Sequence, residues 1–403
     1  MLLHMALKSI TRQEKPAWMY LSRWILTHYF RVQGKENIYN MAKEAMSKKE
    51  YKNPGGIRKR MDENSRPRNW NIQCEFPANL LLEPTNLCNH ACLMCANSKG
   101  AKKGGMIDRE LAKRILKEAY ELGTREVGFY GMGEPLLNKN LEEYIAYAKQ
   151  LGYEYTYITT NGALLSEERA RRLLEAGIDS VKFSINAASP DLYYLIHGKD
   201  EFDTVIRNLI EFDSLRKRQE RNTALYISYI ATRYTASDKE KFKRNYQGYA
   251  DDIVFLDCRS SGDMADELDA YLSAGADTDG LFKSGICPMI FNKLHVTYDG
   301  CLSMCCDDLQ NYLAVADLKE ESLEEAWNNA YARDLRKRHL EHNLKGTRCF
   351  NCMNHCNGPI EPLNPKLAVY IDSKRWNKEQ EIRTRIDKWE QYKRRQETAG
   401  LER

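Results

Sequence analysis

The chain has no run of about 18 consecutive apolar residues, so it offers no candidate for a membrane-spanning helix. Its first residues, 1–12, lack an uninterrupted apolar segment and a small-residue cleavage site, and they do not resemble a signal peptide. The 403 residues include 12 cysteines, which are clustered rather than spread as in a disulfide scaffold. Clustered cysteines without a signal peptide indicate metal ligands in a cytoplasmic protein.

A strong overall charge is also absent, because 61 Lys and Arg are nearly balanced by 57 Asp and Glu. The basic excess is local: residues 1–76 hold 15 Lys and Arg against 7 Asp and Glu. Such a segment either favours an anionic partner, a phosphorylated substrate or a lipid surface, or forms a solvated face. We expect no nucleic-acid partner.

Three cysteines follow an apolar run at residues 79–82, in the spacing C-x3-C-x2-C: Cys88, Cys92 and Cys95. The run predicts a buried strand that leads directly into a cysteine loop. Three thiolates are one fewer than the four that ligate a [4Fe-4S] cluster, so one iron would lack a protein ligand. Catalytic metal sites keep such an open position. The alternative is a zinc site or ordinary buried thiols.

This loop resembles the cluster loop of the radical S-adenosylmethionine (radical SAM) enzymes, whose three cluster ligands match Cys88, Cys92 and Cys95. The resemblance implies that S-adenosylmethionine (SAM) binds the open iron and is cleaved reductively to a 5′-deoxyadenosyl radical. It also implies an external one-electron donor such as flavodoxin or ferredoxin. The residue before the third cysteine is often aromatic in the family and is Met94 here, which weakens any inference about packing beside the adenine.

From residue 80 onward, predicted strands and helices alternate. Strands are predicted at 79–82, 126–130, 153–160, 180–186, 224–232 and 253–256, and helices at 108–122, 140–151, 166–176, 202–216 and 239–249. Six repeats indicate an α/β fold with a parallel sheet, curled into a partial (β/α)6 TIM-like barrel. Its chemistry is expected at the C-terminal ends of the strands.

Polar residues stand at those predicted strand ends. The segment Gly-Met-Gly-Glu-Pro follows the second strand, and its carboxylate can accept hydrogen bonds from an ammonium group. It resembles the family segment that holds the methionyl amino group of SAM. Two further strand ends resemble family contacts to SAM, including its ribose and carboxylate. The cofactor-binding residues implied by the resemblance are Gly131, Gly133, Glu134, Thr160, Asn161, Ser184 and Asn186.

A second set of cysteines lies nearer the C-terminus. Cys287 precedes an apolar alternation and the hairpin signal Asp299-Gly300. A predicted helix at 322–340 separates the cysteines on its two sides, which are Cys301, Cys305 and Cys306 before it and Cys349, Cys352 and Cys356 after it. By spacing alone, a structural four-cysteine zinc site is an open alternative.

Residues 286–357 resemble the SPASM domain, or its shorter form called twitch, which adds auxiliary [4Fe-4S] clusters to radical SAM barrels. Four cysteines match the ligands of the shorter form: Cys287, Cys305, Cys349 and Cys352. The run is shorter than in the full form and no cysteine follows Cys356, so we expect one auxiliary cluster. Cys306 and Cys356 remain alternative ligands. Cys74 and Cys258 are expected to be buried small hydrophobes.

The predicted organisation has five parts: a helical basic N-terminal extension at 1–76, the barrel at 77–258, a linker or lid at 259–285, the iron–sulfur domain at 286–360, and a charged C-terminal helix at 361–403. An amphipathic helix is expected at 17–30, and the basic stretch 47–69 is expected to form a loop. That helix either packs on the main domain or lies in a membrane interface.

Three functions are consistent with these patterns. The favoured one is a radical SAM enzyme that oxidises or epimerises a small polar, carbohydrate-like substrate, including an anionic one. The second is a radical SAM enzyme that modifies peptides. The third is a non-enzymatic iron–sulfur or zinc protein, which has no use for the ligand-holding segment at Gly131–Pro135.

Overall fold

The computed structural model of the chain describes residues 70–99, 103–258, 285–354, 356, 358–369 and 379–401. The predicted helix 17–30, the loop 47–69 and the linker 259–285, apart from its last residue, lie outside this part. Almost all of these residues belong to one compact unit, formed by residues 55–217 and 223–403. None of its described helices has the length and apolar character needed to cross a membrane.

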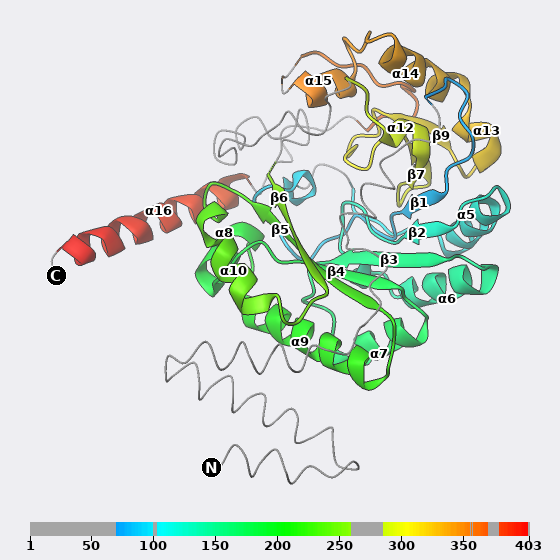
Figure 1. The fold of residues 1–403 in the computed structure, drawn as a ribbon. Helices are drawn as coiled ribbons and strands as arrows, with labels where there is room; N and C mark the ends of the chain where they lie inside the picture. The colour runs from blue at the N-terminus through cyan, green and yellow to red at the C-terminus, as the bar shows by residue number, and fades with distance from the viewer. Residues whose placement is uncertain are drawn as a thin grey trace. The chain divides into compact units, whose positions relative to one another are not determined.

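Nine strands form one sheet, in the order β6-β5-β4-β3-β2-β1-β7-β8-β9 (Figure 1). The first six are parallel and follow one another in the sequence, which confirms the predicted fold class. They are β1 (Asn79–Leu82), β2 (Glu126–Gly128), β3 (Tyr155–Thr160), β4 (Ser180–Ser184), β5 (Ala224–Ala231) and β6 (Asp252–Asp257).

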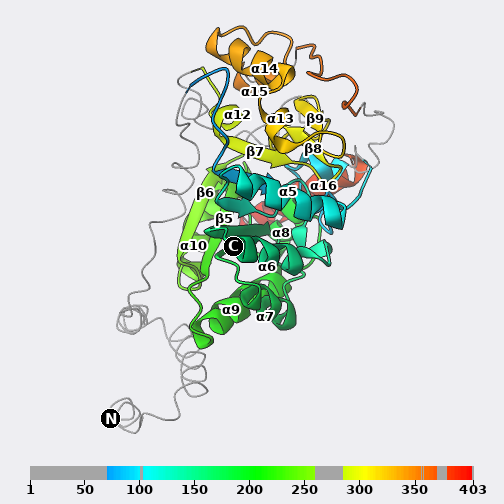
Figure 2. The ribbon, with the colours of Figure 1, turned by 90° about the vertical axis from the view of Figure 1, so that its right-hand side faces the viewer.

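Helices connect these strands and cover one face of the sheet. They are α5 (Arg109–Glu121), α6 (Leu141–Leu151), α7 (Glu167–Glu175), α8 (Pro190–His197), α9 (Phe202–Arg218) and α10 (Lys239–Tyr246). Figure 2 shows α5 and α6 in front of the strands. The predicted N-terminal caps are present, because Asp108 accepts a hydrogen bond from the Leu111 N–H (2.8 Å) and Ser166 from that of Arg169 (3.3 Å).

Strand residues alternate between the helix-covered face and the opposite face. On β4, Val181 and Phe183 are fully buried and belong to the core shared with the helices. Lys182 and Ser184, between and beyond them, are half-buried on the other face. On β3, Tyr157 likewise lies on the other face, whereas its neighbour in sequence, Ile158, belongs to the core. The second face of the sheet therefore carries charged and phenolic groups.

The cysteine-rich C-terminal region continues the sheet of the barrel. The strand β7 (Lys293–Val296) pairs in parallel with β1, and β8 (Cys301–Ser303) and β9 (Ala314–Asp317) add antiparallel strands. The predicted Asp299-Gly300 turn joins β7 to β8, with Gly300 at a φ of 88° that favours glycine. The predicted domain boundary at residue 286 thus does not coincide with a break in the sheet.

Two helix predictions need correction, and one further helix was not predicted. The single helix expected at 322–340 is two helices, α13 (Leu323–Trp327) and α14 (Ala330–Leu340), because Asn329 caps the second one through the Ala332 N–H (3.0 Å). The helix α8, within a segment left unassigned, was missed. The C-terminal helix α16 spans Glu379–Leu401, and the described residues 358–369 are not helical. The short helix α12 (Met289–Asn292) leads directly into β7, and the short helix α15 (Arg348–Asn354) follows α14.

Candidate active site and auxiliary cysteine site

The cysteine loop begins where β1 ends and is held in shape by its own hydrogen bonds. The Cys95 N–H donates to the Cys92 carbonyl (3.2 Å). The Ser98 hydroxyl lies 2.9 Å from the Cys92 carbonyl oxygen and 2.6 Å from that of Cys95. The Cys88 side of the loop is exposed, whereas Cys92 and Cys95 are half-buried. These bonds hold Cys92 and Cys95 in one short, ordered turn, and the His90 N–H donates to the Cys88 sulfur (3.5 Å).

The Gly-Met-Gly-Glu segment packs directly on this loop. A Cβ atom on Gly133 would lie 2.4 Å from the carbonyl oxygens of both Leu87 and Thr85, so no larger residue fits there. The Glu134 N–H donates to that same Leu87 carbonyl (2.8 Å). Gly131 faces the Glu83 side chain, which would lie 2.6 Å from an added Cβ. Glycine at both positions lets the second strand end touch the cysteine loop.

Glu134 joins three of the predicted cofactor residues into one cluster. Its carboxylate accepts hydrogen bonds from the Thr160 hydroxyl (2.7 Å), the Asn161 N–H (2.7 Å) and the Leu136 N–H (3.1 Å). A carboxylate has about four acceptor positions, so about one remains for a ligand ammonium. Burial raises the pKa of Glu134 to about 7, although these hydrogen bonds act in the opposite direction.

The two predicted residues on and after β4 differ in their surroundings. Ser184 is half-buried on the helix-free face of the sheet. Asn186 is buried, with 1% of its surface exposed, and its carboxamide oxygen accepts the Ile230 N–H (2.8 Å). Its amide nitrogen lies 3.3 Å from the ring nitrogen Nε2 of His197, a residue that the sequence analysis did not select.

The four cysteines predicted to hold the auxiliary cluster are electrostatic neighbours. Burial raises the pKa of Cys349, and the thiolates of Cys287, Cys305 and Cys352 raise it further. Burial likewise raises the pKa of Cys287 to about 12, with Cys305 and Cys352 adding to it. Cys287 and Cys349 are therefore costly to ionise without a counter-charge, and a cationic metal group would compensate the charge of their thiolates. The residues present therefore fit a four-thiolate cluster.

The two alternative ligands have different surroundings. Hydrogen bonding with Cys305, and then burial, raise the pKa of Cys306, so Cys306 contacts a member of this group. The Cys356 thiol donates to the Asn351 side-chain oxygen (3.6 Å). The two isolated cysteines, Cys74 and Cys258, are buried as expected, with 6% and 5% of their surface exposed.

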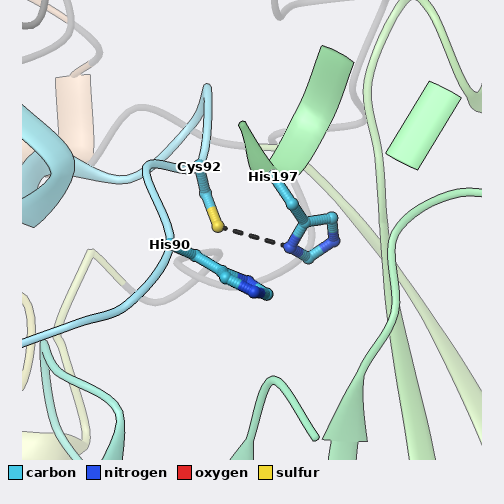
Figure 3. A group of neighbouring side chains, drawn as sticks. All are labelled: His90, Cys92 and His197. Carbon is cyan, nitrogen blue, oxygen red and sulfur yellow. Dashed lines mark hydrogen bonds between the residues drawn. The ribbon is translucent and has the colours of Figure 1, made fainter. Parts of the chain in front are cut away.

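The structure adds three residues beside Cys92 that the sequence analysis missed. The rings of His90 and His197 both lie next to the Cys92 sulfur (Figure 3), and the ligand atoms of the three residues lie within 4.8 Å of one another. Arg385, on α16, donates to the carbonyl oxygen of Ala91 (2.7 Å). His90 lies between Cys88 and Cys92 in the sequence, and this position could have identified it as a residue of the site. Nothing local in the sequence indicates His197 or Arg385.

A parallel sheet with a three-cysteine loop after its first strand, together with a four-cysteine group in the C-terminal region, is the arrangement of an iron–sulfur enzyme of the radical SAM class. Residues 82–225 match the family model of the radical SAM superfamily, and residues 287–353 match that of the SPASM iron–sulfur cluster-binding domain. The chain belongs to the radical SAM superfamily and carries a C-terminal SPASM domain. Its cofactors are accordingly SAM, a [4Fe-4S] cluster and auxiliary iron–sulfur.

A probable GTP 3′,8-cyclase of Saccharolobus solfataricus is 36% identical over 125 residues, which are 31% of this chain and 40% of that protein. The chain thus spans less than half of the length of this relative.

Two solved structures share the fold. SuiB of Streptococcus suis bound to S-adenosylmethionine is 16% identical, with 87% of this chain and 88% of that chain covered and a TM-score of 0.54. Native anSMEcpe with bound AdoMet is 17% identical, with 77% of this chain and 98% of that chain covered and a TM-score of 0.51.

Proposed function

We propose that this enzyme abstracts hydrogen from a small, polar, anionic substrate of carbohydrate-like size and oxidises or epimerises it. In this proposal Cys88, Cys92 and Cys95 hold the SAM-binding cluster, and a one-electron donor such as flavodoxin or ferredoxin reduces it. Cys287, Cys305, Cys349 and Cys352 hold the auxiliary cluster. When bound, SAM and its cluster supply the 5′-deoxyadenosyl radical that abstracts the hydrogen.

The observation that supports an anionic substrate is a pair of lysines on the helix-free face of the sheet. Lys182 on β4 and Lys293 at the start of β7 are both half-buried, and each acts electrostatically on the other and on Cys306. Neither has a carboxylate at ion-pair distance within the described part of the chain. Two partly desolvated cations that have no carboxylate partner among the described residues attract a phosphate or carboxylate group.

Phenols complete this polar surface. The Lys182 ammonium lies 5.8 Å from the ring centroid of Tyr130, whose ring lies 5.9 Å from that of Tyr157. Lys293 donates a hydrogen bond to the Tyr157 oxygen, which donates in turn to the Asn79 side chain (3.1 Å). Tyr157 can take this place because Gly128 beneath it has no Cβ. The surface suits a compact polar substrate with one anionic group.

Replacement of Lys182 by methionine should raise KM for the substrate roughly ten- to hundredfold, because a hydrogen bond to a charged group contributes about 1.5–3 kcal/mol. Burial, and then the charge of Lys293, lower the pKa of Lys182 to about 8. The kcat/KM of the wild type should therefore fall above a pH of about 8, and the variant should not show this decrease. Exposed Lys345, replaced in the same way, is the matched control and should leave KM unchanged. An unchanged KM in the Lys182 variant would remove the lysine pair from the substrate site.

The substrate class is tested with a panel of deuterated sugar phosphates, sugar acids, neutral sugars and peptides. Transfer of deuterium into 5′-deoxyadenosine identifies the substrate and the abstracted position. The proposal expects transfer from an anionic small molecule. Transfer from a peptide alone would replace this function by peptide modification.

Glu134 predicts a pH dependence of SAM binding. Since its pKa is raised to about 7, the carboxyl is protonated below that pH and loses the negative charge that attracts an ammonium group. SAM affinity should fall about tenfold for each pH unit below about 7 and should be constant above it. The free energy of unfolding of the protein without SAM has the opposite pH dependence. The stability that Glu134 contributes is complete below about pH 4.5 and is lost as pH rises through about 7. Equilibrium binding to Glu134→Gln, which does not titrate, should show no such slope.

A further inference from the structure

Cys92 is enclosed by groups from two helices distant in sequence. The Cys92 sulfur lies 3.5 Å from the Nδ1 atom of His197, at the end of α8 (Figure 3). The carbonyl of His197 accepts the Ala91 N–H (3.0 Å), and that of Ile196 accepts the Leu93 N–H (2.8 Å). Both chain neighbours of Cys92 are therefore bonded to the last turn of α8, which fixes the sulfur against the ring.

The hydrogen-bond partners of the other ring nitrogen determine where the imidazole proton lies. The backbone N–H of Asn186 donates to Nε2 of His197 (3.4 Å), and the Asn186 carboxamide lies 3.3 Å from the same atom. The carboxamide oxygen accepts the Ile230 N–H (2.8 Å), so its NH2 group faces the ring. Nε2 is thus an acceptor without a proton. In the neutral ring Nδ1 then carries the proton and donates it toward the Cys92 sulfur.

The ring has little freedom to turn away. His197 is buried, with 1% of its surface exposed, and it stacks on Tyr193 of the same helix with 4.1 Å between ring centroids and 14° between planes. His90 packs edge-on against the His197 ring at 5.4 Å and lies 6.0 Å from the Tyr193 ring. The His90 Nε2 atom is engaged by Glu201 at 2.7 Å. Rigid placement of this kind lets one N–H act at one sulfur.

A positive charge lies on the same side of the loop. Arg385 of α16 is buried, with 4% of its surface exposed, and donates to the carbonyls of Ala91 (2.7 Å) and Tyr194 (3.5 Å). Its charge acts on Cys92 and opposes the effect of burial there. Gly198 makes room for it, because a Cβ at that position would lie 2.1 Å from the guanidinium.

We propose that His197 and Arg385 raise the reduction potential of the cluster that Cys92 would ligate, His197 through its N–H to the sulfur and Arg385 through its charge. One-electron reduction by the external donor adds one negative charge to the cluster and its thiolates. An N–H donor and a cation each stabilise that added charge. Both are positioning residues, because they act through Cys92. The inference rests on the proposed ligation by Cys92.

The test is a potentiometric titration of the anaerobically reconstituted full-length protein, followed by electron paramagnetic resonance of the reduced SAM-binding cluster. His197→Phe keeps the ring stack and removes the N–H. At a fixed solution potential, His197→Phe should lower the ratio of reduced to oxidised cluster about tenfold, which corresponds to about 59 mV for one electron. His197→Asn, which offers an amide N–H near the former Nδ1, should restore most of the ratio.

Arg385→Met should lower the ratio in the same direction, whereas Lys388→Met, an equal charge loss at an exposed site on α16, should not. A His197→Phe or Arg385→Met protein with full cluster content and an unchanged potential would overturn the assignment for that residue. If His197→Phe fails to load the cluster, His197→Leu, which also removes the N–H, takes its place as the test of His197, and Arg385→Met tests Arg385 separately. Failure of the ligand proposal has a different signature, because Cys92→Ala would then retain the cluster.

Discussion

Cys92→Ala is expected to abolish formation of 5′-deoxyadenosine from SAM. Two thiolates and a methyl group cannot hold the cluster whose open iron would bind SAM, and a water-filled position is a poor substitute for a thiolate. The reconstituted wild type should contain about eight irons, and this variant about four. Iron analysis and chromatographic detection of 5′-deoxyadenosine under anaerobic conditions measure both effects.

Two other cysteines provide the controls. Cys349→Ala should also lose about four irons, but from the auxiliary site, so it should still cleave SAM while substrate turnover stops. Cys74 is buried at 6% exposure and its thiol donates to a backbone carbonyl, so Cys74→Ala should keep all iron. Deoxyadenosine formation by Cys92→Ala at the wild-type rate would contradict the ligand assignment. An iron content of about four in the wild type, together with zinc, would contradict the auxiliary cluster.

Gly133→Ala is the second substitution with a large expected effect. The added methyl would lie 2.4 Å from two backbone oxygens, and backbone cannot move aside as a flexible side chain can. We expect a loss of about 1–3 kcal/mol in the free energy of unfolding and a displacement of Glu134 from the cysteine loop. Because Glu134 is proposed to hold the SAM ammonium, affinity for SAM should fall with it. Chemical denaturation and equilibrium SAM binding measure the two effects.

Gly123→Ala is a suitable comparison. Its φ of 108° makes any side chain strained, but an added Cβ meets no atom within 4 Å. This variant should therefore lose about 1 kcal/mol of stability through backbone strain and keep wild-type SAM affinity. Wild-type affinity in Gly133→Ala as well would show that contact between the two strand ends is not needed for the cofactor.

Local patterns in the sequence were sufficient to predict most of the fold. Apolar runs and caps such as Asp108 and Ser166 act within a few residues, and the structure shows both caps. The hairpin signal Asp299-Gly300 acts equally locally. The split between α13 and α14 was missed because Asn329 resembles an ordinary helix residue until its side chain is seen to cap the second helix.

The sequence by itself determined the class of chemistry, because thiols bind iron–sulfur clusters and the spacing C-x3-C-x2-C places three of them on one turn. Only the tertiary structure decided what surrounds them. His197 is 105 residues from Cys92, and Arg385 is 294 residues from the carbonyl of Ala91 that it binds. Likewise, Lys182 lies on a barrel strand and Lys293 on a strand of the auxiliary hairpin. Hydrogen bonds and charges act through space, so groups this far apart along the chain leave no local pattern that predicts their contact.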